Sequence, residues 1–165
     1  MMLKLIRFKE VKSTNEEAIK LIKSKNKKDG IVISNYQTKG KGTMGKKWVS
    51  IKGNFFASIF FELKKNMPKP KEFSLINPLI IKNAIKDYTR FEVKIKWPND
   101  LLIRSKKVCG ILQEFIKIEK KSFLIIGIGI NTFKSPKNNK FKSTSLLECS
   151  HKSINNSQIL NNIKK

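Results

Sequence analysis

The second half of the chain is the most constraining feature of the sequence, because short apolar runs alternate there with short polar turns. Turns at residues 104–106 and 119–121 separate apolar runs at residues 101–103, 108–118 and 123–130. Connections this short join neighbouring strands that run antiparallel. The second half therefore predicts successive strands in a sheet that is mostly antiparallel or mixed.

Two helices are expected in the first half of the chain. The segment Ser13-Thr14-Asn15-Glu16-Glu17 carries capping-box signals and predicts a helix that runs to about Lys25. A second helix is expected over residues 73–88, with Pro78 near its first turn.

Three further strands complete the expected sheet. Residues 31–33 form a short buried run, and residues 55–63 are apolar on nearly both faces, as in the centre of a sheet. Residues 93–97 alternate and stop at Pro98-Asn99-Asp100, a turn-forming sequence. The expected fold is α+β, with a mixed, mostly antiparallel central sheet flanked by helices.

The length of 165 residues suffices for one ordinary core. We expect a catalytic-type domain over residues 1–148. Residues 149–165 are expected to form a polar tail that contains the start of a short helix near Ser157.

The net charge of +24 comes almost entirely from lysine, since only three of the 36 basic residues are arginine. Lysine, isoleucine and asparagine together make up 71 of the 165 residues, as AT-rich codon usage alone would produce. We therefore interpret the charge as mostly compositional, although it favours acidic partners.

Several protein classes are disfavoured by composition. The longest apolar run has eight residues, far fewer than the roughly 20 that a membrane-spanning helix needs. Two cysteines and one histidine exclude a disulfide framework and a histidine-rich metal cluster. We expect a soluble cytoplasmic protein with no membrane partner.

The sequence Gly40-Lys41-Gly42-Thr43-Met44-Gly45-Lys46-Lys47-Trp48 combines glycines with cations. Glycines let a backbone approach an anion closely, and lysines supply the charge. The spacing matches neither the P-loop nor the dinucleotide-binding pattern. Taken alone, the stretch is either an anion-binding loop or a surface loop.

Two other positions suggest chemistry. Asp100 follows a strand near lysines that suit polyphosphate, so its carboxylate could hold Mg²⁺. Lys107 stands at the edge of a strand, where an ammonium group could meet an anionic reaction centre, although it is one of 33 lysines.

Gly127 and Gly129 interrupt a buried strand, which indicates that something packs closely against its backbone. A flat ligand ring and a crossing helix both satisfy this requirement.

In order, these motifs resemble the catalytic domain of the biotin protein ligases over roughly residues 5–148. The resemblance is carried by Ser13-Thr14-Asn15, Tyr36-Gln37, the glycine-rich stretch, Lys96-Trp97-Pro98-Asn99-Asp100-Leu101, Lys107-Val108-Cys109-Gly110-Ile111-Leu112 and Gly127-Ile128-Gly129-Ile130-Asn131. It implies the catalytic fold that these enzymes share with class II aminoacyl-tRNA synthetases.

The resemblance also implies site residues. Those implied to bind biotin are Ser13, Thr14, Asn15, Gln37, Gly40, Lys41, Gly42, Thr43, Lys107, Gly110, Gly127 and Gly129. Those implied to bind ATP or the adenylate are Lys41, Lys46, Trp48, Asn99, Asn131, Thr144 and Ser145. Lys107 and Asp100 are the implied catalytic residues, with Asp100 also the implied Mg²⁺ ligand.

The sequence departs from the fuller family motif. Family members carry arginine where this chain has Lys41, Thr43, Met44 and Lys46. Lysine keeps the charge but loses the bidentate fork of arginine. The threonine at position 43 implies weaker retention of the adenylate. The chain matches neither the N-terminal helix-turn-helix nor the C-terminal β-barrel of fuller members, so DNA repression is not expected.

The implied reaction joins biotin to a lysine of an acidic biotin carboxyl carrier protein through biotinyl-5′-AMP, with ATP and Mg²⁺. A homodimer is a further expectation. The alternatives are a degraded ligase that binds biotin without full transfer, a lipoate–protein ligase and a basic nucleic-acid-binding module. The nucleic-acid module would need stacking aromatic residues on an exposed face, whereas most phenylalanines here lie in core-like runs.

Overall fold

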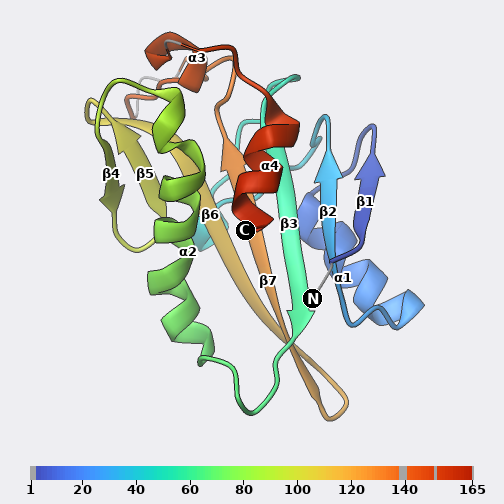
Figure 1. The fold of residues 1–165 in the computed structure, drawn as a ribbon. Helices are drawn as coiled ribbons and strands as arrows, with labels where there is room; N and C mark the ends of the chain where they lie inside the picture. The colour runs from blue at the N-terminus through green and yellow to red at the C-terminus, as the bar shows by residue number, and fades with distance from the viewer. Residues whose placement is uncertain (1–2, 138–140, 151, 165) are drawn as a thin grey trace.

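The computed structural model describes residues 3–137, 141–150 and 152–164. Its centre is a seven-stranded sheet of order β1-β2-β3-β7-β6-β5-β4 (Figure 1). The strands are β1 (Leu5–Phe8), β2 (Asp29–Ser34), β3 (Phe55–Glu62), β4 (Val93–Lys96), β5 (Asp100–Ile103), β6 (Lys106–Ile118) and β7 (Lys121–Ile130). Only β1 and β2 pair in parallel, so the expected mixed, mostly antiparallel sheet is confirmed.

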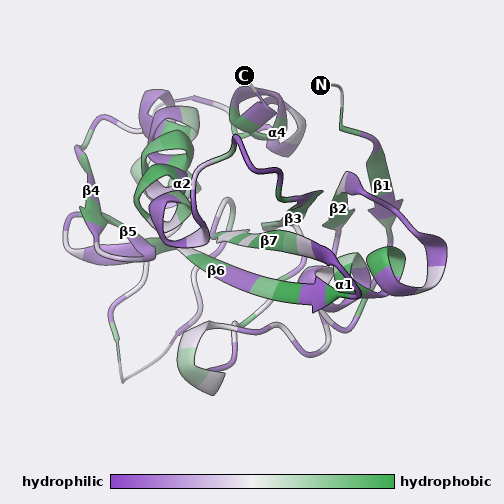
Figure 2. Cartoon of the chain, turned by 90° about the horizontal axis from the view of Figure 1, so that it is seen from below, coloured by the Kyte–Doolittle hydropathy of each residue, from purple (hydrophilic) through white to green (hydrophobic). Residues whose placement is uncertain are grey.

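Four α-helices accompany the sheet in the described residues. They are α1 (Thr14–Lys25), α2 (Pro70–Ile85), α3 (Leu146–Cys149) and α4 (Asn156–Lys164). Figure 2 shows α2 and α4 together on one side of the sheet. Alternating strand residues explain the two layers: Ile31 and Leu124 belong to the core with α2 and α4, whereas Val32 and Ile125 pack with α1.

The prediction for the second helix was wrong at its start and in the place of its proline. The helix begins at Pro70 rather than residue 73, and Pro78 lies buried in its middle. Pro70 suits the first helical position because its fixed φ is already helical. The Glu72 carboxylate accepts a hydrogen bond from the Lys69 backbone N–H at 2.5 Å, which strengthens this start. Residues 86–88 form a separate 3₁₀ turn.

The short strand β1 had no counterpart among the predicted elements. It pairs with β2 in parallel at the edge of the sheet, and its four residues are too few to show a clear periodicity.

The chain returns at its C-terminal end to the α2 side of the sheet. Ile159, Leu160 and Ile163 of α4 are buried with α2 and the sheet, which supports a helix of only nine residues. The predicted domain boundary after residue 148 stays a prediction. In the part of the chain that is described, none of the helices is long and apolar enough to cross a bilayer.

Candidate active site

A cavity of about 710 Å³ lies on the α1 side of the sheet, under the glycine-rich loop. It brings together predicted residues that are far apart in the sequence. Those that line it are Ser13, Thr14, Asn15, Gln37, Lys41, Gly42, Thr43, Lys46, Trp48, Asn99, Asp100, Lys107, Gly110, Gly127, Gly129 and Asn131. Gly40, Thr144 and Ser145 do not line the cavity, and the binding roles of all these residues remain predictions.

One end of the cavity is neutral and polar, and the start of α1 forms it. Gln37 Oε1 accepts a hydrogen bond from the Thr14 backbone N–H at 2.8 Å and lies 3.1 Å from Thr14 Oγ1. The predicted capping box is absent, because the side chain of the N-cap residue Ser13 makes no capping hydrogen bond. Gln37 instead accepts the hydrogen bond from the first free backbone N–H group of α1, that of Thr14.

Asn15 occupies the space that Gly127 leaves open. A Cβ added to Gly127 would collide with the amide oxygen of Asn15. The Asn15 amide is held by Glu114 Oε2 at 2.6 Å from its Nδ2 atom and by Ser58 Oγ at 2.5 Å from its Oδ1 atom. The start of α1 therefore packs against β7 at Gly127. This contact agrees with the crossing-helix interpretation of that glycine.

The indole of Trp48 lies against the next pair of glycines. Gly110 on β6 and Gly129 on β7 are register partners, and a Cβ on either would lie 2.7 Å or less from an indole carbon. The flat ring that packs against Gly129 is therefore a side chain of the protein and not a ligand. In the described structure Trp48 Nε1 is buried without a hydrogen-bond partner, so this donor is available to a ligand.

Gly40, although outside the cavity wall, makes the position of Trp48 possible. Its carbonyl accepts from the Trp48 backbone N–H at 2.9 Å, and a Cβ there would lie 2.7 Å from the Trp48 carbonyl oxygen. The two backbone segments that carry the glycine-rich loop can approach this closely only at glycine.

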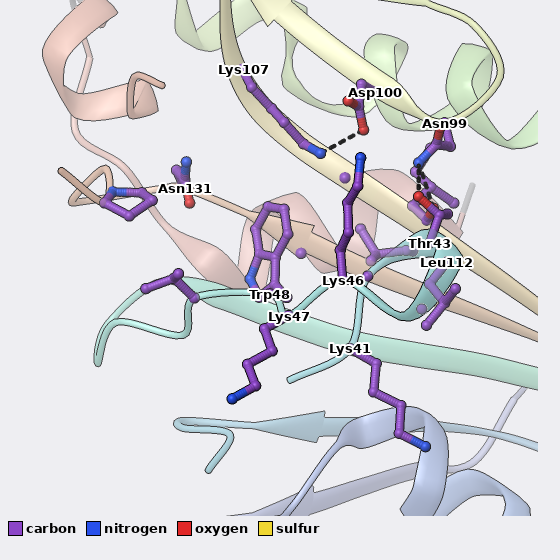
Figure 3. A pocket seen from close by; sticks show the side chains of 18 of the residues that line it. Lys41, Thr43, Lys46, Lys47, Trp48, Asn99, Asp100, Lys107, Leu112 and Asn131 are labelled. Carbon is purple, nitrogen blue, oxygen red and sulfur yellow. Dashed lines mark hydrogen bonds and ion pairs between the residues drawn. The ribbon is translucent and has the colours of Figure 1, made fainter. Parts of the chain in front are cut away.

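Lys107 reaches the cavity because of an irregularity in the β5–β6 ladder. Leu101 pairs with Cys109 but Leu102 pairs with Lys107, so one extra residue, Val108, is accommodated on β6. This bulge places Lys107 on the same face of the sheet as Gly110. In a regular strand, two residues that are three positions apart would point to opposite faces. Its Nζ lies 2.7 Å from Asp100 Oδ1 and 5.5 Å from the centre of the Trp48 ring (Figure 3).

The lysines of the glycine-rich loop point in different directions. Figure 3 shows Lys46 directed toward the Lys107–Asp100 pair, whereas Lys41 points away from it. Lys41 forms an ion pair with Glu16 of α1 at 2.7 Å. The hydrogen bond to Glu16 raises the pKa of the Lys41 ammonium group, although burial acts in the opposite direction. Lys41 therefore fastens the loop to α1, and Lys46 adds positive charge at the cavity centre.

The two asparagines support opposite walls. Asn99 Nδ2 lies 3.4 Å from Thr43 Oγ1, so it connects the Trp-Pro-Asn-Asp turn to the loop. Asn131 Nδ2 donates to the Thr144 carbonyl at 3.2 Å, while its buried Oδ1 atom has no partner in the described structure. Asn131 thus offers one free acceptor to a ligand.

Thr144 and Ser145 lie behind Asn131 and bind Glu148. Thr144 Oγ1 donates to one carboxylate oxygen at 3.0 Å, and Ser145 Oγ donates to the other at 3.1 Å. Burial would raise the pKa of Glu148, but these bonds and one from Ser135 outweigh it and lower that pKa. This cluster fixes the chain beside Lys107, whose backbone N–H donates to the Lys142 carbonyl at 3.0 Å.

Several residues around the cavity were missed from sequence. Lys96 and Lys142 add to its positive wall, while Ser58 and Glu114 support Asn15. Ser58 was detectable, because it is a polar residue inside an otherwise apolar run. Lys96 stands in the Lys-Trp-Pro-Asn-Asp motif but was not assigned a role, and Lys142 and Glu114 carry no such signal in a lysine-rich chain.

The described residues do not form a metal site of their own. Asp100 is engaged by Lys107, and among these residues no group of three histidines, cysteines or acidic residues could hold a metal ion. The arrangement fits Mg²⁺ only if phosphate oxygens of a nucleotide supply most of its ligands. The Mg²⁺ role of Asp100 stays a prediction.

Comparisons with known proteins agree on one family. The family model described as Biotin/lipoate A/B protein ligase family matches residues 7–131. The Bifunctional ligase/repressor BirA of Bacillus subtilis is 32% identical over 134 residues, which cover 80% of this chain and 41% of that protein. The Biotin--[acetyl-CoA-carboxylase] ligase of Paracoccus denitrificans is 30% identical over 127 residues, which cover 75% and 52%. The chain thus spans about half the length of these relatives, or less.

Solved structures agree with the sequence relatives. The biotin protein ligase from Aquifex aeolicus, solved in complex with biotin and ATP, superposes with a TM-score of 0.79 at 32% identity, covering 98% of this chain and 67% of that one. The biotin protein ligase from Leishmania major, in complex with biotinyl-5-AMP, gives a TM-score of 0.84 at 26% identity, covering 99% and 73%.

Proposed function

The chain belongs to the biotin/lipoate A/B protein ligase family, and from this premise we propose that it activates biotin with ATP and transfers it to a lysine of a carrier protein. The observation that carries the proposal is the two-ended cavity. Its neutral polar end at Thr14, Asn15 and Gln37 suits a cyclic urea. Its other end, beyond Lys107, is rich in lysine and suits a triphosphate.

The proposed first step forms biotinyl-5′-AMP. A carboxylate oxygen of biotin attacks the α-phosphorus of ATP, and the bond to the β-phosphate breaks to release pyrophosphate. Both reactants are anions, so cations must bring them together. Lys107 and Lys46 suit that purpose, with the substrate carboxylate displacing Asp100 from Lys107. Mg²⁺ would enter as part of the MgATP substrate.

The proposed second step transfers the biotinyl group. The neutral amine of a carrier lysine attacks the acyl carbon, the bond to AMP breaks, and the lysine nitrogen loses one proton. No protein nucleophile is required. The nearby Cys109 is fully buried, and burial raises the pKa of its thiol, so it is unsuited to that function.

Trp48 and the glycine-rich loop are proposed to protect the adenylate. The loop lies over the cavity, and the Lys41–Glu16 ion pair fastens it to α1. Excluding water matters because a mixed anhydride hydrolyses readily. The net charge of +24 would speed encounter with an acidic carrier.

The experiment combines the purified chain with biotin, MgATP and a biotin carboxyl carrier domain, and follows the carrier by intact-mass spectrometry. The proposal predicts one added biotinyl group per carrier, and none without ATP. Biotin-dependent pyrophosphate release without transfer would point to the degraded ligase. Transfer of lipoate but not biotin would point to a lipoate–protein ligase.

A further inference from the structure

We propose that Ser58 is a positioning residue that sets the donor and acceptor pattern of the biotin-binding end, although it does not line the cavity. The inference rests on the proposed function. Ser58 is fully buried on the central strand β3, and its Oγ lies 2.7 Å from Thr14 Oγ1 and 2.5 Å from Asn15 Oδ1. One hydroxyl with one proton thus contacts two side chains of the cavity wall.

The orientation of the Asn15 amide is fixed first. Its Nδ2 atom faces the Glu114 carboxylate at 2.6 Å and the Leu112 carbonyl at 3.3 Å, and both of these groups can only accept. Both Nδ2 protons are therefore used inside the protein, and Oδ1 must face Ser58. Asn15 has no proton left for a ligand, but Oδ1 keeps one lone pair.

The protons of the two hydroxyls then have one consistent order. Asn15 Oδ1 can only accept, so the Ser58 proton points to it. Thr14 Oγ1 lies 2.7 Å from Ser58 Oγ, and two lone pairs would repel at that distance, so the Thr14 proton points to Ser58. The alternative acceptor for Thr14, Gln37 Oε1, is farther away at 3.1 Å and already accepts the Thr14 backbone N–H.

The result is a relay in which Thr14 donates to Ser58 and Ser58 donates to Asn15. The side chains of both cavity residues then present acceptors only, and a ligand group bound to them must supply N–H donors. A cyclic urea with two N–H groups satisfies this requirement, whereas a dithiolane ring supplies no donor. Ser58 thereby selects biotin over lipoate without contacting either ligand.

The test measures dissociation constants by titration calorimetry for biotin, desthiobiotin and ATP. Desthiobiotin keeps both urea N–H groups but lacks the thiophane ring. Ser58→Ala removes the relay, so we expect about tenfold weaker binding of both ureas and ATP binding within twofold of the unmodified chain. Ser58→Thr, which keeps the hydroxyl, should restore most of the urea affinity.

Ser34→Ala is the matched control, because Ser34 is also buried and lies on the neighbouring strand β2, outside the cavity. It should leave urea binding unchanged. If Ser58→Ala fails to fold, Ser58→Cys keeps a side chain of similar shape with only a weak donor and should show the same selective loss.

Two results would overturn the inference. Unchanged urea affinity in Ser58→Ala would show that no relay is needed, and equal losses for ureas and ATP would show a general structural defect. If the unmodified chain binds ATP but neither urea, the proposed function itself fails, and the inference with it.

Discussion

Replacing Gly129 with alanine should destabilise the chain through one identifiable contact, the Trp48 indole. The added Cβ would lie 2.5 Å from Trp48 Cε2 and 2.8 Å from Cζ2. Carbon atoms in contact prefer about 3.5–4.0 Å, so the ring must move by roughly 1 Å or leave its position. Overpacking of this kind costs about 1–3 kcal/mol of unfolding free energy.

Gly129→Ala should no longer lower the unfolding free energy when the indole of Trp48 is absent. In a Trp48→Ala background, Gly129→Ala only replaces glycine by alanine within a strand, which alone favours folding by roughly 0.5–1 kcal/mol. A double-mutant cycle should therefore give a coupling of about 1.5–4 kcal/mol between the two positions. Urea denaturation followed by far-ultraviolet circular dichroism measures it without relying on tryptophan fluorescence.

Gly127→Ala is the matched control, since it lies two residues away on the same face of β7. Its Cβ would meet Asn15 instead of Trp48, so removing the indole should not rescue it. Coupling below about 0.5 kcal/mol at Gly129, which is within ordinary additivity, would refute the reasoning. Equal rescue at both glycines would do the same.

Three further predictions concern the site and its support. Lys107→Ala should lower the rate of biotinyl-AMP formation by about 100-fold, measured by pyrophosphate release, because a cation at the reacting anions is lost. Glu148→Gln should remove a pH dependence of unfolding. Because the pKa of Glu148 is lowered from its ordinary value of 4.5, this residue stabilises the fold above pH 4.5, and that stability is lost as the pH falls through the folded-state pKa. Urea titrations between about pH 6 and 3 should show this loss in the unmodified chain but not in Glu148→Gln. Thr43→Arg should reduce the biotinyl-AMP released into solution, measured by chromatography, and unchanged release would contradict the suggested importance of that position.

The sequence predicted the fold where the signals were local. The turns predicted at residues 104–106 and 119–121 overlap the β5–β6 and β6–β7 connections, and the apolar run of β3 lies inside the sheet. The predicted start of α2 is three residues late, because proline favours the first turn of a helix whereas Pro78 is buried in the middle of α2. Tertiary packing tolerates this proline at a position where local preference does not.

The site was predictable as a set of residues but not as an arrangement. Glycines at 127 and 129 indicated a close approach to β7, yet nothing local identified Asn15 and Trp48 as the groups that approach. The direction of Lys107 depends on a bulge in the β5–β6 ladder, which strand periodicity does not reveal. The contacts of the two glycines join segments dozens of residues apart, so only the folded chain defines them.

Biotin-dependent exchange of labelled pyrophosphate into ATP tests the central claim most directly, because it reports formation of biotinyl-5′-AMP without a carrier. The account predicts exchange that requires both biotin and the purified chain, is supported by desthiobiotin and falls about 100-fold in Lys107→Ala. Exchange that proceeds equally with lipoate, or its absence while biotin and ATP both bind, would contradict it.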